Sequence, residues 1–174
     1  PAERTYFPVP DNDEPLIAVA KDKEQNIPII YLFHKHEAVK PEEKGNMDYM
    51  VYSYLTSMIE SMLNTRLEEL TQKADAPFIQ AFAGDGDYLL SKTKGAFMGI
   101  AAAKEDGILT ATEALMREIE RVRQFGFTAS EYARAKADYL RSLEVAYNER
   151  DKQRTNSYVK EYVRHFIDNE PIPG

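Results

Sequence analysis

Hydrophobic and polar positions follow two different rhythms along this chain, and the rhythm changes from segment to segment. Between residues 27 and 36 apolar side chains recur at every second position, which predicts a strand. An apolar run at Leu16–Lys21 precedes this strand across a polar turn, so we expect the two segments to form a β-hairpin. Residues 77–90 and 93–104 are two more predicted strands. The first strand is expected to present one apolar face, made of Ile27, Ile29, Tyr31 and Phe33.

A longer period appears between Asn46 and Lys73. Apolar residues recur there at three- and four-residue steps, which predicts a long amphipathic helix. Several members of the apolar stripe are methionines, a residue that commonly fills irregular gaps in protein cores. We therefore expect this stripe, including Leu55 and Met58, to lie on the sheet.

The last third of the chain is also helical in pattern. Residues 110–125 predict a helix that Gly126 ends as a C-cap. Thr128 and Glu131 have the spacing of a capping box, in which a hydroxyl and a carboxylate satisfy two backbone N–H groups at a helix start. The helix that begins there is expected to break near residues 153–156.

Taken together, hairpin strands and helices predict an α+β fold. The connections between consecutive strands are too short for parallel crossovers, so the sheet is expected to be mainly antiparallel, with helices packed on one face. We expect residues 1–170 to form a single domain and residues 171–174, which are rich in Pro and Gly, to begin a linker.

Composition narrows the function. The chain has 174 residues, 43% of them hydrophobic and 29% charged, which is ordinary for a globular protein. Its formal net charge of -7 argues against a nucleic-acid partner, and no apolar run reaches the length of a membrane span. The absence of cysteine excludes disulfides, thiolate nucleophiles and cysteine-bound zinc. Because the chain opens at Pro1 in an extended stretch, we interpret it as a piece of a longer protein.

The candidate chemistry is sparse. His34 and His36 alternate on one predicted strand face, so they are expected to be ordinary polar surface residues. The alternative is a metal site that adds Glu37 or His165. The segment Gly84–Asp87 is too short of ligands for a calcium loop and is expected to be a turn. The sequence also offers a candidate interface with another domain, in a segment that combines Tyr and Arg residues. It comprises Tyr147, Asn148, Arg150, Arg154, Tyr158 and Tyr162.

Several segments in the same order carry a resemblance. They are Phe125–Thr128 followed by Glu131 and Arg134–Lys136, then Glu144–Lys152, and finally the exit Glu170–Gly174. Together they resemble the pitrilysin-like (insulinase-family) zinc metallopeptidases, and more narrowly the second domain of a long bacterial member. The resemblance implies the α+β fold shared by domains of pitrilysin and mitochondrial processing peptidase. The family's catalytic motif, H-x-x-E-H, is not in this sequence.

The resemblance therefore implies a parent that is a zinc metalloendopeptidase and a chain that is its inactive domain. Such a chain has no catalytic or metal-binding residues of its own, and zinc belongs to the parent's catalytic domain. Its partners are neighbouring domains of the same polypeptide and the parent's peptide substrate, and a cell-envelope or periplasmic location is expected. The alternative is a peptide-binding or scaffold subunit whose parent has lost zinc catalysis. A self-sufficient hydrolase would need a nucleophile and base that the sequence does not supply.

Overall fold

A computed structural model describes residues 5–152 and 154–172 of the chain. These residues form two compact units, which are described separately. The first unit contains residues 5–38 and 63–126, and the second contains residues 39–62 and 127–172 without residue 153. The expected single domain over residues 1–170 stays a prediction.

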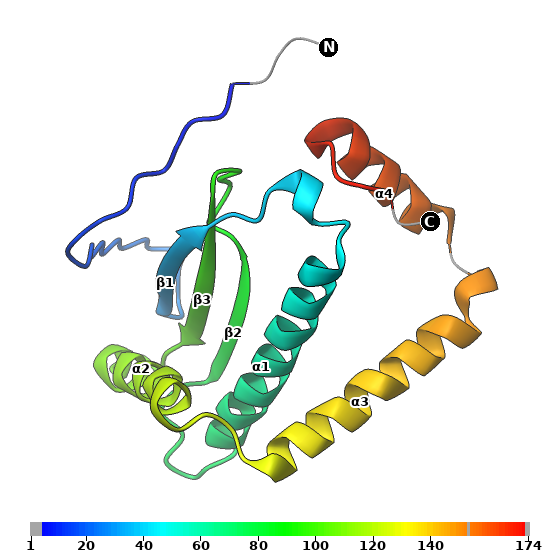
Figure 1. Ribbon diagram of the computed structural model, residues 1–174. Helices are drawn as coiled ribbons and strands as arrows, with labels where there is room; N and C mark the ends of the chain where they lie inside the picture. The colour runs from blue at the N-terminus through cyan, green and yellow to red at the C-terminus, as the bar shows by residue number, and fades with distance from the viewer. Residues whose placement is uncertain (1–4, 153, 173–174) are drawn as a thin grey trace. The chain divides into compact units, whose positions relative to one another are not determined.

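An antiparallel sheet of three strands is the centre of the first unit (Figure 1). The strands are β1 (Ile29–Glu37), β2 (Gln80–Asp87) and β3 (Lys94–Ala102). Their order is β1-β3-β2, so β3 pairs with both neighbours and the other two are edge strands. The predicted strands at residues 77–90 and 93–104 are confirmed with shorter bounds.

Helix α2 (Ile108–Phe125) covers one face of this sheet and packs on β1 and β3. The contact is close because β3 has a glycine at its middle. A Cβ added at Gly99 would lie 3.2 Å from Cδ1 of Ile119 and 3.3 Å from Cδ2 of Leu115. The absence of a side chain at Gly99 therefore lets the strand backbone approach the helix.

The other face of the sheet carries large apolar side chains with no helix of this unit over them. Tyr31 and Phe82 both stand opposite Ile100, one residue along from Gly99, and successive strand residues point to opposite faces. Tyr31 is 56% exposed and Phe82 is 49% exposed. The α+β fold is confirmed. The apolar face predicted for β1, which includes Tyr31, is the face away from α2.

Helix α1 (Met47–Thr71) contributes its residues 63–71 to the first unit. Leu63 and Leu67 from this part of the helix are almost fully buried, as is Phe78 at the entry to β2. The amide of Asn64 is hydrogen-bonded to the edge of β2, where it donates to the carbonyl of Ala83 and accepts from its N–H. Residues 63–71 are thereby fastened to the sheet.

Two expectations about this unit are wrong. Leu16–Lys21 is not a strand, because residues 15–22 adopt no regular structure, and the predicted hairpin with residues 27–36 is absent from the described residues. A short apolar run needs a hydrogen-bonded neighbour to become a strand, and no pairing partner for it follows from the pattern alone. Gly84–Asp87 is not a turn between strands but the second half of β2. Ladder hydrogen bonds to β3 hold it extended despite its two glycines.

The second unit is helical. It contains the first part of α1, residues 47–62, together with α3 (Ala129–Asn148) and α4 (Thr155–Asp168). Two short 3-10 helices, η1 (Pro41–Glu43) and η2 (Arg150–Lys152), also belong to it. The expected break in the last helical stretch is confirmed, and it lies between α3 and α4. No helix among the described residues is long and apolar enough to cross a membrane.

A small core holds α1 and α3 together in this unit. Met58, Met62 and Ala135 are buried, and Tyr54 and Tyr139 pack against them with their ring centroids 5.2 Å apart. The predicted capping box at the start of α3 is confirmed, with the Thr128 and Glu131 side chains each bonded to the other's backbone N–H.

The expectation that the apolar stripe of α1 lies on the sheet is wrong for Leu55, which is exposed, and Met58 packs against α3 instead. Met58 is 3% exposed, whereas Leu55 is 54% exposed and Met50 is 62% exposed. Within the second unit, the helices pack mainly around one short patch of α1, which leaves the rest of the stripe open to solvent. An amphipathic pattern reports a face that benefits from burial, and only the neighbouring elements decide how much of it is covered.

Candidate functional site

Three of the six predicted interface residues lie at the elbow between α3 and α4. Tyr147 and Asn148 end α3, and Arg150 begins η2. The Arg150 guanidinium lies 4.2 Å from the centre of the Tyr147 ring and donates a hydrogen bond of 2.7 Å to the Tyr147 carbonyl. The structure therefore brings Tyr147 and Arg150 together as a stacked pair on the surface, where Tyr147 is 66% exposed.

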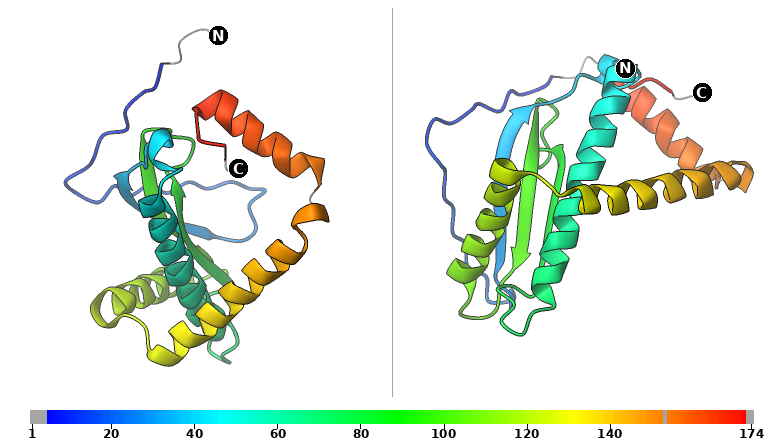
Figure 2. Two further views of the ribbon diagram at one scale, coloured as in Figure 1. Left: turned by 45° about the vertical axis from the view of Figure 1, so that its right-hand side comes forward. Right: turned by 60° about the horizontal axis from the view of Figure 1, so that its bottom comes forward.

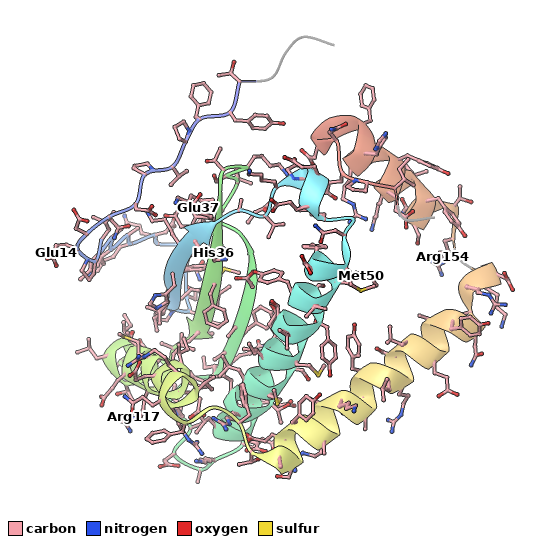
Figure 3. The ribbon with its side chains drawn as sticks, viewed as in Figure 1. Glu14, His36, Glu37, Met50, Arg117 and Arg154 are labelled. Carbon is pink, nitrogen blue, oxygen red and sulfur yellow. The ribbon has the colours of Figure 1, made fainter. Side chains whose placement is uncertain are left out.

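The other three predicted residues belong to the beginning and middle of α4. Arg154, which is labelled in Figure 3, is the N-cap residue of α4. Its side chain makes no capping hydrogen bond. Tyr158 and Tyr162 follow on the helix at four-residue spacing, so they share a face. The apolar face that they belong to is exposed and comprises Tyr158, Val159, Tyr162, Val163 and Phe166. α4 has no buried residue, although its sequence is amphipathic.

The far end of α4 is fixed within the same unit. Asn169 ends the helix in the left-handed conformation, and Glu170 then forms an ion pair with Lys44 beside η1. The next residue, Pro171, packs so closely on Gly45 that a Cβ added at that glycine would lie 2.7 Å from the proline Cγ. The first residue of the expected linker, Pro171, is thus packed within this unit, and residues 173–174 of the linker lie outside the described residues.

A polar cluster occupies one end of the sheet in the first unit. His36 on β1 stands opposite Gly95 on β3, and the imidazole reaches past that glycine to Asp85 on β2. Its Nε2 lies 2.8 Å from the Asp85 carboxylate, and its Nδ1 lies 2.9 Å from the carbonyl oxygen of Glu37. A Cβ at Gly95 would lie 2.4 Å from the imidazole, so the glycine makes this bridge across three strands possible.

Both ring nitrogens of His36 face acceptors, and this arrangement favours the protonated ring. Partial burial lowers the pKa of His36, but the hydrogen bonds to the Glu37 carbonyl and the Asp85 carboxylate raise it by more. The net result is a pKa above the ordinary value of 6.5. His34, two residues earlier on the same strand, is exposed.

Lys94 is the second member of this cluster. It begins β3, is 6% exposed, and forms ion pairs with Glu37 at the end of β1 and with Asp11 of the N-terminal segment. The hydrogen bonds to Glu37 and Asp11 raise the pKa of Lys94, which keeps it charged. The sequence shows Lys94 as one more polar residue at a strand start, so pattern reasoning missed it, and only the fold reveals both partners.

Within the part of the chain that the structure describes, no metal site is built on the three histidines. His36 is bonded to Asp85, whereas Nδ1 of His165 lies 2.7 Å from the carbonyl oxygen of Glu170 in the other unit. Among the described residues there is no group of three His, Cys, Asp or Glu side chains placed to hold a metal ion.

An open hollow of about 610 Å³ lies between residues 5–9 and the β2–β3 turn. Its lining is largely apolar and includes Tyr6, Phe7, Tyr88 and Leu90, with Lys92 as the charged member. The Thr93 hydroxyl donates a hydrogen bond to the carbonyl oxygen of Phe7 and accepts one from the N–H of Val9. These bonds hold both residues at the rim of the hollow. The hollow offers no pair of groups for acid–base or nucleophilic chemistry.

Comparisons with known proteins agree on one kind of relative. No family model matches this chain. A "Zinc protease PQQL-like" of Arabidopsis thaliana is 25% identical over all 174 residues, and these correspond to 15% of that protein. The chain therefore spans a small fraction of the length of the curated relative that it matches.

Solved structures show the same fold. The crystal structure of the periplasmic protease PqqL from Escherichia coli superposes with a TM-score of 0.74 over 88% of this chain, at 21% identity. The matched part is 16% of that protein, and 32% of the separate crystal structure of its first half. This chain thus has the fold of a segment from the first half of PqqL, and its sequence is similar to that of a PqqL-like zinc protease.

Proposed function

We propose that this chain is a non-catalytic domain of a pitrilysin-like zinc endopeptidase, in which it helps to enclose the space where peptides or small proteins are cleaved. The observation that carries the proposal is the extent of the match. The whole chain aligns with a zinc protease, yet it corresponds to only 15% of that protein. A segment of this length is the size of one domain within a much larger enzyme.

The non-catalytic role rests on the residues themselves. The sequence has no H-x-x-E-H motif, which supplies two zinc ligands and the general base in this type of peptidase. His36 and His165 are engaged in hydrogen bonds of the scaffold, and they belong to different units. Zinc is accordingly assigned to another domain of the parent.

Neighbouring domains of the same polypeptide are the proposed partners of this chain. Their contact surface is the elbow with the adjoining face of α4, defined by Tyr147, Asn148, Arg150, Arg154, Tyr158 and Tyr162. Tyr and Arg are enriched in the centres of interfaces, and the stacked pair of Tyr147 and Arg150 is already arranged on the surface. Amphipathic α4 has an apolar face that its own unit leaves exposed, so a partner that covers it would gain burial energy.

A complementation experiment tests both the domain role and the surface. The chain is co-expressed with the rest of its parent polypeptide as a separate piece, and complex formation and peptide hydrolysis are measured. We expect a complex that weakens about tenfold or more when Tyr147 and Arg154 are both changed to Ala. Arg117→Ala, at an exposed position in the first unit, is the matched control and should leave the complex intact. Failure to associate, or equal effects of the two sets of changes, would contradict this assignment.

The second candidate is a peptide-binding or scaffold subunit whose parent has lost zinc catalysis. Metal analysis and peptide hydrolysis of the full-length parent separate the two. About one zinc per chain, with hydrolysis abolished by a chelator, supports the enzyme, whereas peptide binding without zinc or turnover supports the scaffold. The proposed envelope location follows from the periplasmic PqqL, and fractionation of cells that produce the parent tests it.

A further inference from the structure

The turn between β2 and β3 presents large apolar side chains on a strained backbone. Leu89 and Leu90 at its tip are 63% and 97% exposed. Leu89 has a φ of 53°, in the left-handed region where the Cβ of an L-residue crowds the following carbonyl oxygen. Such strain persists only where the surrounding structure fixes the backbone, and it is concentrated at binding and catalytic sites. The tip of this turn is therefore a place to look for a ligand.

Hydrogen bonds within the turn hold its backbone in place. The Ser91 hydroxyl accepts from the N–H groups of Thr93 and Lys94 at 3.1 Å and 3.2 Å. The N–H of Tyr88 bonds the carbonyl oxygen of Lys94, and the N–H of Ser91 bonds that of Tyr88, both at 2.9 Å. A ligand that packs on this turn therefore meets a fixed surface, and little ordering of the backbone opposes its binding.

The N-terminal segment is the second wall of the hollow, and it is fastened to the same turn. The Thr93 hydroxyl bonds the backbone of Phe7 and Val9. Pro10 and Asp11, which follow, are bonded to lysines of β1 and β3. The segment and the turn lie side by side in Figure 1 and in both views of Figure 2. Both walls of the hollow are thus formed without a ligand.

The space between these walls has the size and the lining of a site for an apolar group. Its volume of about 610 Å³ lies within the range of about 300–1,000 Å³ that is typical of ligand sites. Most of the lining is apolar, and Tyr6, Phe7 and Tyr88 contribute aromatic rings to it. The hollow is open to solvent, so it suits one peptide side chain better than a long alkyl chain, which needs an enclosed site to leave water.

Lys92, the charged residue of the described lining, indicates what else the occupant carries. Its ammonium lies 3.7 Å from the Asp87 carboxylate, and the two side chains are 49% and 56% exposed. An exposed pair of this kind contributes little to stability, so a ligand carboxylate can replace Asp87 at low cost. A ligand with a carboxylate beside an apolar group therefore matches the hollow in charge and in polarity. The last residue of a peptide carries both groups on one Cα atom.

We propose that the hollow is a recognition site for the C-terminal residue of a peptide, whose apolar side chain packs against Tyr88 and Leu89 while its carboxylate binds Lys92. Burial of the side chain supplies the affinity, and the charge of Lys92 selects a chain end over an internal residue. The site rests on the proposed function for its ligand, because a domain of an endopeptidase or of a peptide-binding subunit meets peptides with free ends.

Fluorescence anisotropy with the full chain and synthetic peptides tests the site. The probe is a short glycine- and serine-rich peptide, labelled at its N-terminus, that ends in leucine with a free carboxylate. The comparison peptides are the same sequence with a C-terminal amide and one that ends in serine with a free carboxylate. We expect the probe to bind about tenfold or more tightly than either of them. Equal affinity for the acid and the amide, or no binding of the probe, would overturn the proposal.

Variants of the lining show whether the peptide occupies this hollow. Lys92→Met keeps an apolar side chain without the charge, so it should abolish the preference for the acid over the amide, whereas Lys104→Met at an exposed position of the same unit should keep it. Leu90→Asp should weaken probe binding about tenfold or more. Leu109→Asp is its matched control, since Leu109 is 84% exposed at the start of α2. Equal effects within either pair of variants would contradict the assignment.

Competition and sedimentation distinguish other occupants of the hollow. Decanoate supplies a carboxylate and an apolar chain without a peptide, and its displacement of the probe as effectively as the unlabelled peptide would assign the hollow to a fatty acid. Dimers in sedimentation that Leu90→Asp dissociates would assign it to a second copy of this chain. Either result would overturn the proposal. These measurements need neither catalysis nor a partner domain, so their failure is separate from failure of the complementation experiment, which tests the proposed function.

Discussion

Arg66 of α1 and Glu118 of α2 form a buried ion pair in the first unit, with 3.4 Å between Nη1 and Oε1. Their side chains are only 9% and 8% exposed. Arg66 also donates a hydrogen bond of 3.1 Å to the carbonyl oxygen of Gly126, and Arg121 reaches Glu118 from the same helix. One buried guanidinium thus connects residues 63–71 of α1 with both the middle and the end of α2.

Loss of one partner in this pair should be costly. Glu118→Gln leaves the buried guanidinium beside a neutral group, so we expect the free energy of unfolding to fall by about 3 kcal/mol. Glu113→Gln breaks an exposed pair with Arg117 on the same helix and should change it by less than about 0.5 kcal/mol. Urea unfolding of both variants measures the difference. Equal stabilities would show that the charge of Glu118 is not needed to hold Arg66.

Two positions on α1 should respond differently to the same substitution. Met58 belongs to the core of the second unit and is 3% exposed, whereas Leu55 is 54% exposed. Met58→Asp buries an unpaired carboxylate and should cost more than about 3 kcal/mol. Leu55→Asp should cost less than about 1 kcal/mol in the isolated chain. Thermal unfolding of the two variants is the measurement, and a similar loss in both would mean that Leu55 is covered in solution.

The end of α2 requires a glycine. Gly126 has φ 64° and ψ -148°, a conformation that is essentially restricted to glycine, although a Cβ there would meet no atom within 4 Å. Gly126→Ala should therefore destabilise the fold by about 1–3 kcal/mol through backbone strain alone. Gly86→Ala is the matched control, since a Cβ there also meets no atom within 4 Å and its φ is not positive. Chemical denaturation distinguishes them, and an unchanged Gly126→Ala would contradict the assignment.

The bridge made by His36 predicts a dependence of stability on pH. The pKa of His36 is raised in the folded chain, so the ring binds its proton more tightly in the folded state than in the unfolded state. This contribution is complete below the unfolded pKa of about 6.5 and is lost as the pH rises through the folded pKa.

The measurement is urea unfolding of the chain and of two variants across this range. The stability advantage of the original chain over His36→Gln should shrink as the pH is raised from about 5.5 to 8.5. His34→Gln, at an exposed position on the same strand, leaves the bridge intact and is the matched control. A constant difference between the original chain and His36→Gln would show that the bridge does not titrate with folding.

Much of the secondary structure was predictable because its causes are local. The capping box at Thr128 and Glu131, the glycine end of α2 and the period of α1 each lie within a few residues of one another in sequence. The candidate interface residues were predicted from composition, and the structure places them on one elbow and helix. Their role as an interface stays a prediction, since no neighbouring domain is present.

What the sequence by itself determined was where most of the helices and strands form and that the motif H-x-x-E-H is absent. Only the tertiary structure decided which apolar faces are covered and which polar residues meet. Leu55 and Met58 belong to one amphipathic pattern, yet only Met58 is buried against neighbouring side chains. Lys94 forms its ion pairs with Asp11 and Glu37, which are both far from it in the sequence. Burial and ion pairing are contacts between distant parts of the chain, so they depend on how the elements pack rather than on the local order of residues.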